Sequence, residues 1–120
     1  MNQSYDANTA ESLIPLLRVM NRELHERNKD IKTLSRKLGK LAGKTDVSKR
    51  ELRILEGHLF AQIANHKREV RVTKRELLRL GCSIDETDTQ LVLIPGEDGE
   101  FEGGYAWHVG EVGLQALQPD

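Results

Sequence analysis

The chain has 120 residues, enough for one domain with a modest core. Charged residues make up 31% of it and aromatic residues 4%, a mixture that favours helices over a large sheet. No apolar stretch approaches the roughly 18 residues that cross a membrane, and the polar N-terminus lacks the apolar core of a signal peptide, so we expect no membrane partner. The single cysteine, Cys82, indicates a reducing compartment, and we expect a cytoplasmic protein.

Charge is distributed unevenly along the chain. All 18 Lys and Arg residues lie between Arg18 and Arg79, together with eight acidic residues, so this stretch carries a net charge of +10. Residues 81–120 contain nine acidic residues and no basic residue. Opposite charges in two parts of one chain favour antiparallel self-association.

The first predicted helix covers residues 9–43. Asn8 and Ser12 are alternative N-caps, and the second would place Pro15 in the first turn, where a missing N–H costs no hydrogen bond. Gly43 is a suitable stop. Steps of three and four residues, typical of a coiled-coil helix, separate most of its apolar side chains: Leu13, Leu17, Met20, Leu24, Ile31, Leu34, Leu38 and Leu41.

The second predicted helix covers residues 48–80. Ser48 and Glu51 form a capping box, the clearest local signal in the chain, and Gly81 ends the helix. Its stripe contains His66 and Thr73 among apolar residues: Leu52, Leu55, Leu59, Ile63, Val70, Leu77 and Leu80.

A short connection between two long helices makes them antiparallel. If residues whose numbers add up to 90 lie opposite each other, the two apolar stripes meet, and Arg27 and His66 form a buried polar layer among them. Such a hairpin buries only one narrow seam, which is marginal for a stable monomer. We therefore expect a homodimer, with hairpins side by side or head to tail.

Residues 82–117 form an acidic segment with the pattern of β structure. Strands are predicted at residues 91–94 and 105–109, separated by Pro and Gly residues, with a short edge strand at 82–84. The predicted fold class is α+β, mainly α. It comprises a long antiparallel, coiled-coil-like helical hairpin with a small C-terminal antiparallel β element, in a single domain over residues 1–120.

Residues near both ends of the chain carry a resemblance to a known family. The opening pattern F-T-x-E-E-A-N-x-L-x-P is matched in spacing at four positions: Tyr5, Ala10, Leu13 and Pro15. The later segments Gly-Leu-Val-Asp-Phe-Pro and L-C-W-x-x-G-E are matched at six: Leu91, Val92, Pro95, Trp107, Gly110 and Glu111. On these residues the chain resembles the uncharacterised bacterial domain-of-unknown-function family 2203.

The resemblance implies a helical hairpin followed by a β unit, and it implies no known reaction. Leu93 and Ala106 stand where the family has Asp and Cys, and residues around Leu114 to Ala116 stand where it closes with Trp-His. Because these are the family's most reactive side chains, a chemistry shared among its members is not carried over to this chain.

Two patterns suggest ligands but favour ordinary structure. Residues 39–45 look like a phosphate-binding loop, yet three residues rather than four separate the glycines, and the segment ends a helix. The four histidines form no i, i+3 or i, i+4 pair, and the acidic loop at residues 85–88 lacks the spacing of a calcium-binding loop. The sequence predicts no metal site and no cofactor.

A basic stripe on the second helix could follow the phosphates of a nucleic acid: Arg68, Arg71, Arg75 and Arg79. Glu69 and Glu76 interrupt the stripe, however, and no exposed aromatic set offers base stacking. The acidic C-terminal segment could also neutralise it within the chain. Nucleic-acid binding is therefore the third hypothesis.

The second hypothesis is a small-molecule site or enzyme where helices and sheet meet. Its candidate ligand-binding residues are Tyr5, Arg18, Trp107 and Glu111, although a Trp on such a strand is typically part of the core. No paired general acid and base is visible, so we predict no catalytic residue and favour a protein that is not an enzyme. The leading hypothesis is a non-catalytic interaction module that pairs with itself.

Overall fold

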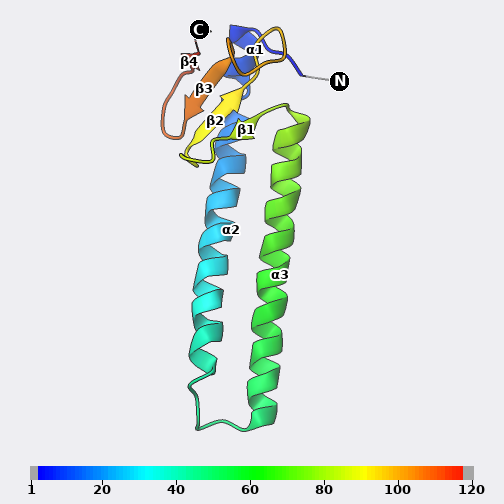
Figure 1. The fold of residues 1–120 in the computed structure, drawn as a ribbon, viewed down its shortest axis with the longest axis vertical. Coiled ribbons are helices and arrows are strands. Elements are labelled where there is room, and N and C mark those ends of the chain that lie inside the picture. The colour runs from blue at the N-terminus through cyan, green and yellow to red at the C-terminus, as the bar shows by residue number, and fades with distance from the viewer. Residues whose placement is uncertain (1–2, 118–120) are drawn as a thin grey trace. The chain divides into compact units, whose positions relative to one another are not determined.

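The computed structural model describes residues 3–117. Its elements follow the order α1 (Ala7–Ser12), α2 (Ile14–Leu41), α3 (Lys49–Arg79), β1 (Ser83–Ile84), β2 (Leu91–Ile94), β3 (Tyr105–His108) and β4 (Gln115–Ala116) (Figure 1). Long helices and a small antiparallel sheet confirm the predicted fold class. The chain separates into two compact units, unit 1 (Met1–Arg22 and Thr73–Asp120) and unit 2 (Glu23–Val72). The organisation as one domain stays a prediction.

The predicted first helix is divided into α1 and α2 at Leu13. Both predicted N-caps are wrong, because Asp6 caps α1: its Oδ1 accepts the N–H of Thr9 at 2.8 Å, and the Asp6 N–H donates to Thr9 Oγ1 at 3.0 Å. The N–H of Thr9 also lowers the pKa of Asp6. Since α2 begins at Ile14, Pro15 lies in its first turn, where the missing N–H breaks no helical hydrogen bond.

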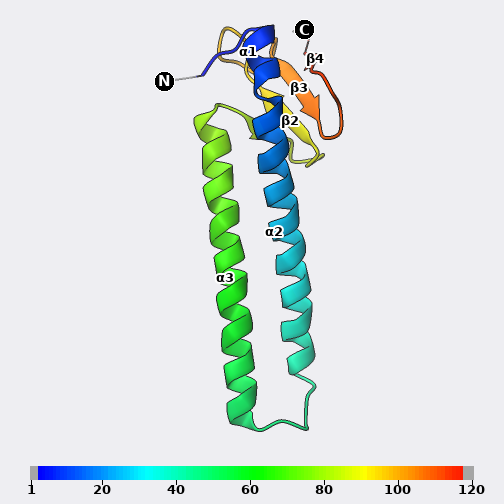
Figure 2. The same cartoon turned by 180° about the vertical axis from the view of Figure 1, so that it is seen from behind.

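Unit 2 is a pair of antiparallel helices. Figure 1 and, from behind, Figure 2 show α2 and α3 side by side, joined by residues 42–48. Ser48 Oγ accepts the N–H of Glu51 at 3.1 Å and caps α3, as predicted. Residues 39–45 end α2 and pass into the connection, without the strand that a phosphate-binding loop follows.

The seam of unit 2 is only partly covered. Leu41 and Ile63 are buried. Leu55, predicted to lie in the seam, is 41% exposed. Further apolar side chains of the predicted stripes are neither buried nor fully exposed: Ile31, Leu34, Leu38, Leu52 and Leu59. Two helices cover only one side of each other, so the flanks of a wide apolar stripe stay in contact with water.

Unit 1 contains the sheet, whose strand order is β1-β2-β3-β4 with every neighbouring pair antiparallel. In the longest pairing Val92 lies opposite Trp107. The strands predicted at residues 91–94 and 105–109 are confirmed as β2 and β3, and the short edge strand as β1. The sequence did not predict β4, because two exposed residues carry no alternation.

The core of unit 1 is closed. Trp107 and Ile94 are fully buried, and Leu17, Val92 and Cys82 nearly so. These side chains come from α2, the strands and the turn that follows α3, so helix and sheet cover each other within this unit. Unit 1 therefore has a closed core, whereas the seam of unit 2 is buried only at some positions, among them Leu24, Leu41, Ile63 and Val70.

Two glycines allow the chain to close around this core. Gly81 has a φ of +78°, and the N–H of Cys82 donates to the Leu77 carbonyl at 3.0 Å while that of Gly81 donates to Leu78 at 2.9 Å, the Schellman arrangement that ends α3. At Gly104 a Cβ would collide with the carbonyl oxygen of Ile94. Any larger residue there would force this turn away from β2.

Candidate functional site

Tyr5, the first predicted ligand-binding residue, is tied into the fold. Its hydroxyl donates to the Leu80 carbonyl at 2.7 Å, and its N–H donates to the Gly96 carbonyl at 3.2 Å. Burial, and then the nearby Cys82 thiol, raise the pKa of the phenol. These bonds anchor the N-terminal segment to residues that follow α3 and β2, which is a structural role.

The structure brings together the other three predicted residues: Arg18, Trp107 and Glu111. The Trp107 indole N–H donates to the main-chain carbonyl of Glu111 at 3.0 Å, and the Arg18 guanidinium carbon lies 5.9 Å from the ring centroid. Trp107 is fully buried, so its ring faces core atoms and the Arg18 side chain rather than an open pocket. This geometry favours the core interpretation of Trp107.

An open pocket of about 230 Å³ lies elsewhere in unit 1. Its apolar wall includes the exposed side chains of Leu78 and Phe101, and its polar wall includes Arg79 and Glu100. None of the four predicted ligand-binding residues lines it. Sequence reasoning missed this pocket because its walls come from α3 and from a glycine-rich loop. No local pattern predicts that these two segments lie close together.

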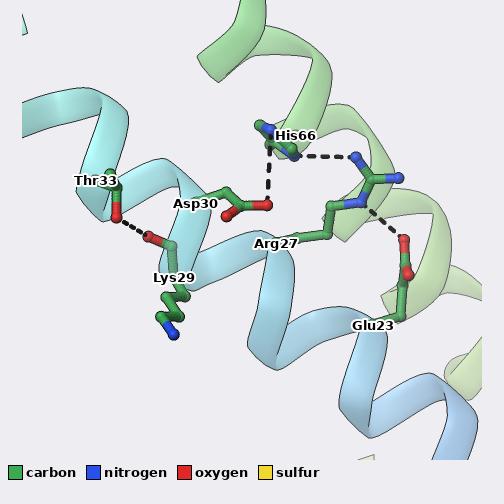
Figure 3. A network of polar contacts seen from close by, with 6 residues as sticks. All are labelled: Glu23, Arg27, Lys29, Asp30, Thr33 and His66. Carbon is green, nitrogen blue, oxygen red and sulfur yellow. Dashed lines mark hydrogen bonds and ion pairs between the residues drawn. The ribbon is translucent and has the colours of Figure 1, made fainter. Parts of the chain in front are cut away.

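The most extensive polar network recorded in unit 2 centres on Arg27 and His66 (Figure 3). Arg27 Nε donates to Glu23 Oε1 at 2.8 Å, one turn earlier on α2. Arg27 Nη1 lies 3.0 Å from His66 Nδ1 on α3, and His66 Nε2 lies 4.0 Å from Asp30 Oδ2. Four side chains from two helices thus form one chain of contacts, which we call the Arg27 network.

Proton positions in the network follow from Arg27. A guanidinium only donates, so His66 Nδ1 must be the acceptor, and in the neutral ring Nε2 carries the proton that faces Asp30. The Glu23 carboxylate, through its hydrogen bond, is the main cause that raises the pKa of Arg27, with smaller contributions from Glu69 and Asp30. Arg27 therefore remains a cation among carboxylates.

The Arg27 network is partly exposed, where the sequence predicted a buried layer. The Arg27 and His66 side chains are 27% and 20% exposed. The physical reason is the same as for the partly exposed leucines. Two helices cover only one side of each other, and no third element of unit 2 covers this side. The predicted register also placed Arg27 opposite Ile63, but the long arginine side chain reaches His66, almost one turn further along α3.

The basic stripe is exposed on α3: Arg68, Arg71, Arg75 and Arg79. Within unit 1, as far as residues 3–117 describe it, no ion pair joins Arg75 or Arg79 to the acidic segment. The expected internal neutralisation is therefore absent at these two positions. The stripe's role as a phosphate-binding face stays a prediction.

Among residues 3–117, no group of three or more His, Cys, Asp or Glu side chains is arranged to hold a metal ion. His108 Nε2 lies 3.4 Å from Asp88 Oδ2, and Asp88 Oδ1 accepts the N–H of Gln90 at 3.1 Å. The acidic loop thus uses its carboxylates to hold its own turn.

Within residues 3–117, no helix combines the length and apolar character that a membrane crossing requires.

Comparison with known families tests whether the resemblance noted in the sequence reflects family membership. The family described as Uncharacterized conserved protein (DUF2203) matches residues 3–117 of the chain. The chain belongs to this family. That description assigns no activity, so the function of this DUF2203 protein is unknown. No curated protein and no solved structure matches the chain.

Two departures from the DUF2203 pattern meet in the structure. Leu93 on β2 and Ala106 on β3, which stand where the resemblance places Asp and Cys, are directly opposite each other in the antiparallel register. Opposed residues in a sheet project from the same face. In this chain that position holds two apolar side chains, which offer neither a nucleophile nor a base.

Proposed function

We propose that this protein is a non-catalytic helical interaction module that assembles with a second copy of itself through unit 2. The observation that carries the proposal is the partly exposed row of leucines on α2 and α3. Burial of apolar surface contributes about 25 cal/mol per Å², so covering this row favours association.

Heptad spacing supports a coiled-coil type of pairing. Leu34 and Leu41 follow Arg27 at intervals of seven residues on α2, and Leu52 and Leu59 precede His66 at the same interval on α3. Residues seven apart lie on nearly one line of a helix, so each helix offers a continuous stripe to a partner. A four-helix arrangement of two hairpins would cover both stripes.

The chemistry of the chain supports a non-catalytic role. Leu93 and Ala106 leave the sheet without reactive groups at the family's most suggestive positions. In the Arg27 network, His66 Nδ1 is occupied by Arg27 and is not free to act as a base. The free thiol of Cys82 fits a cytoplasmic protein of a bacterial family, which completes the proposal.

Molecular mass in solution tests self-association. We expect a homodimer by sedimentation or light scattering at high micromolar concentration and low salt. A strict monomer under these conditions would overturn the proposal. Leu55→Glu should dissociate the dimer, because it places a charge at the edge of the seam.

The matched control is Ile54→Glu. Ile54 neighbours Leu55 on α3 and is 50% exposed, but it points away from the seam by helical spacing. We expect Ile54→Glu to leave the dimer intact. Equal dissociation by both variants would mean that the seam is not the interface.

A small-molecule site is the second candidate, favoured by the pocket between Leu78 and Phe101. Its mixed walls suit a ligand with one apolar and one charged end. Mass spectrometry of the purified protein under native conditions would detect a retained ligand. Loss of that ligand in Leu78→Glu would assign it to the pocket.

Nucleic-acid binding is the third candidate, favoured by the exposure of the basic stripe. Binding through Arg68 and Arg71 must weaken steeply between low and moderate salt, because neutralised phosphates release counterions. Binding that ignores salt would exclude the stripe.

A further inference from the structure

We infer that two histidines make the fold respond to pH in opposite directions: acid breaks the contact of His66 with Arg27 in unit 2 and secures the contact of His108 with Asp88 in unit 1. Histidine is the side chain whose charge ordinarily changes between about pH 5 and pH 8. The inference goes beyond the proposed function, because each contact lies within one unit and neither contact needs a second copy of the chain.

His66 on α3 lies between two charged side chains of α2 (Figure 3). Its Nδ1 lies 3.0 Å from Arg27 Nη1, and its Nε2 lies 4.0 Å from Asp30 Oδ2. The Glu23 and Glu69 carboxylates lie close enough to Arg27 to favour its positive charge. The ring therefore has one cationic partner and one anionic partner on α2.

Only the neutral ring of His66 fits this arrangement. A guanidinium has donors and no acceptor, so Nδ1 must offer its lone pair to Arg27. Protonation places an N–H on Nδ1, which then meets a second donor and a second positive charge. The Nε2–H group still faces Asp30, and a cationic ring is attracted more strongly to that carboxylate. Acid therefore releases His66 from Arg27 and favours Asp30 as its partner.

His108, the last residue of β3, has the opposite requirement. Its Nδ1 lies 3.2 Å from the Val109 carbonyl oxygen, and its Nε2 lies 3.4 Å from Asp88 Oδ2. Both partners are acceptors, but a neutral ring carries only one N–H. The neutral ring leaves one nitrogen lone pair facing an oxygen, whereas the cation donates to both oxygens. Only the protonated ring therefore satisfies both contacts.

Acidic residues surround His108 in the chain segments next to it. Asp88 belongs to the connection between β1 and β2, whose other acidic residues are Asp85 and Glu86. Glu111 follows in the turn after β3, and its N–H donates to the His108 carbonyl at 3.0 Å. The neighbouring strands β2 and β4 contain no charged residue. These carboxylates favour a positive charge on the ring.

The cation recorded near β3 does not compete for Asp88. Arg18 lies against the Trp107 ring, and successive residues of a strand project from opposite faces, so Arg18 and His108 lie on different faces of β3. Within unit 1, as far as residues 3–117 describe it, the ion pair recorded for Asp88 is the one with His108.

Protonation of His108 connects the end of β3 to the turn before β2. Asp88 Oδ1 accepts the N–H of Gln90 at 3.1 Å, while Oδ2 faces His108. The Gln90 carbonyl in turn accepts the N–H of Val109 at 2.9 Å. One carboxylate thus holds its own turn and, in acid, the end of β3 as well.

Nuclear magnetic resonance of the full chain tests the response of His66. Close contacts between protons of the Arg27 side chain and the His66 ring should be present at pH 8 and lost at pH 5. His25 and His58, exposed on α2 and α3, show in the same spectra when an exposed histidine becomes charged. An equally strong contact at both pH values would overturn the inference for unit 2.

The matched control for unit 2 is His66→Asn. The amide oxygen of asparagine replaces Nδ1 as the acceptor and does not titrate. We expect the Arg27 side-chain signals to shift between pH 5 and pH 8 in the wild type and to stay constant in His66→Asn. The same shift in both proteins would mean that His66 is not its cause.

Hydrogen exchange tests the response of His108. The protection factor of the Gln90 amide, which is corrected for the intrinsic effect of pH, should fall roughly two- to fivefold from pH 5 to pH 8, as expected for an exposed ion pair. In His108→Gln an amide nitrogen replaces Nε2 as a donor that does not titrate, so the protection factor should stay constant. Protection that is independent of pH in the wild type contradicts the inference for unit 1.

Two further measurements keep the outcomes distinguishable. Circular dichroism at pH 5 and pH 8 checks that each variant is folded. Molecular mass measured on the same samples shows whether the chain self-associates. A monomer that shows both pH responses overturns the proposed self-association and leaves this inference standing, whereas a dimer without either response does the reverse.

Discussion

Unit 1 and unit 2 use the same kinds of apolar residue with different results. In unit 1, helices and a sheet enclose Trp107 and Ile94 completely. In unit 2, two helices meet along one seam and leave leucines half covered. A sheet and a helix form two layers that shield a common core, whereas two helices alone cannot enclose one. The comparison teaches that one chain can close one core completely and leave the apolar seam of another unit partly exposed.

The largest effect should come from the core of unit 1. Trp107→Ala removes a fully buried side chain and should lower the free energy of unfolding by about 3–5 kcal/mol. Chemical denaturation followed by circular dichroism measures the loss. Phe60→Ala in unit 2, where the ring is exposed, should stay within about 0.5 kcal/mol. Similar losses from both would erase the contrast between the units.

A pair of identical substitutions sharpens the contrast further. Leu17→Ala in unit 1 should cost about 2–5 kcal/mol at every protein concentration, because that side chain is buried within its own unit. Leu38→Ala in unit 2 should cost less, and under the proposed self-association its cost should grow as the protein concentration rises and the dimer forms. Unfolding at several protein concentrations checks this. An effect of Leu38→Ala that ignores concentration would speak against assembly through unit 2.

The helix cap of unit 1 should give a smaller effect. Asp6→Ala removes the acceptor for the Thr9 N–H and should be seen as faster hydrogen exchange in α1. Because the pKa of Asp6 is lowered in the fold, its contribution is present above the ordinary carboxyl pKa and is lost as pH falls through the lowered value. Asn8→Ala is the control. At pH 6 we expect the amide hydrogens of α1 to exchange more slowly in Asn8→Ala than in Asp6→Ala.

The smallest effect concerns the single cysteine of unit 1. Burial raises the pKa of Cys82 from 9.0 to about 11, so the folded chain holds a proton that the unfolded chain loses in this window. Stability should therefore fall as pH rises from 9 to 11, and Cys82→Ala should show a shallower fall. Melting temperatures at pH 8 and pH 10 measure the difference. Parallel pH profiles would mean that the thiol is accessible in the fold.

The sequence by itself determined the main elements and the family. Apolar steps of three and four residues marked α2 and α3, Ser48 and Gly81 marked two helix ends, and the run from Leu91 to Ile94 marked β2. These signals are local, because period, cap and stop depend on neighbours within a few residues. The residues shared with the DUF2203 pattern were likewise readable one by one.

Only the tertiary structure decided how these elements are covered. The exposure of Leu55, the contact of Arg27 with His66 and the opposition of Leu93 to Ala106 depend on residues far apart in the chain. The strand β4 forms because β3 offers it an edge, and its two residues alone carry no strand signal. Periodicity states which side of an element is apolar, but the area that a neighbour covers depends on how many elements pack there.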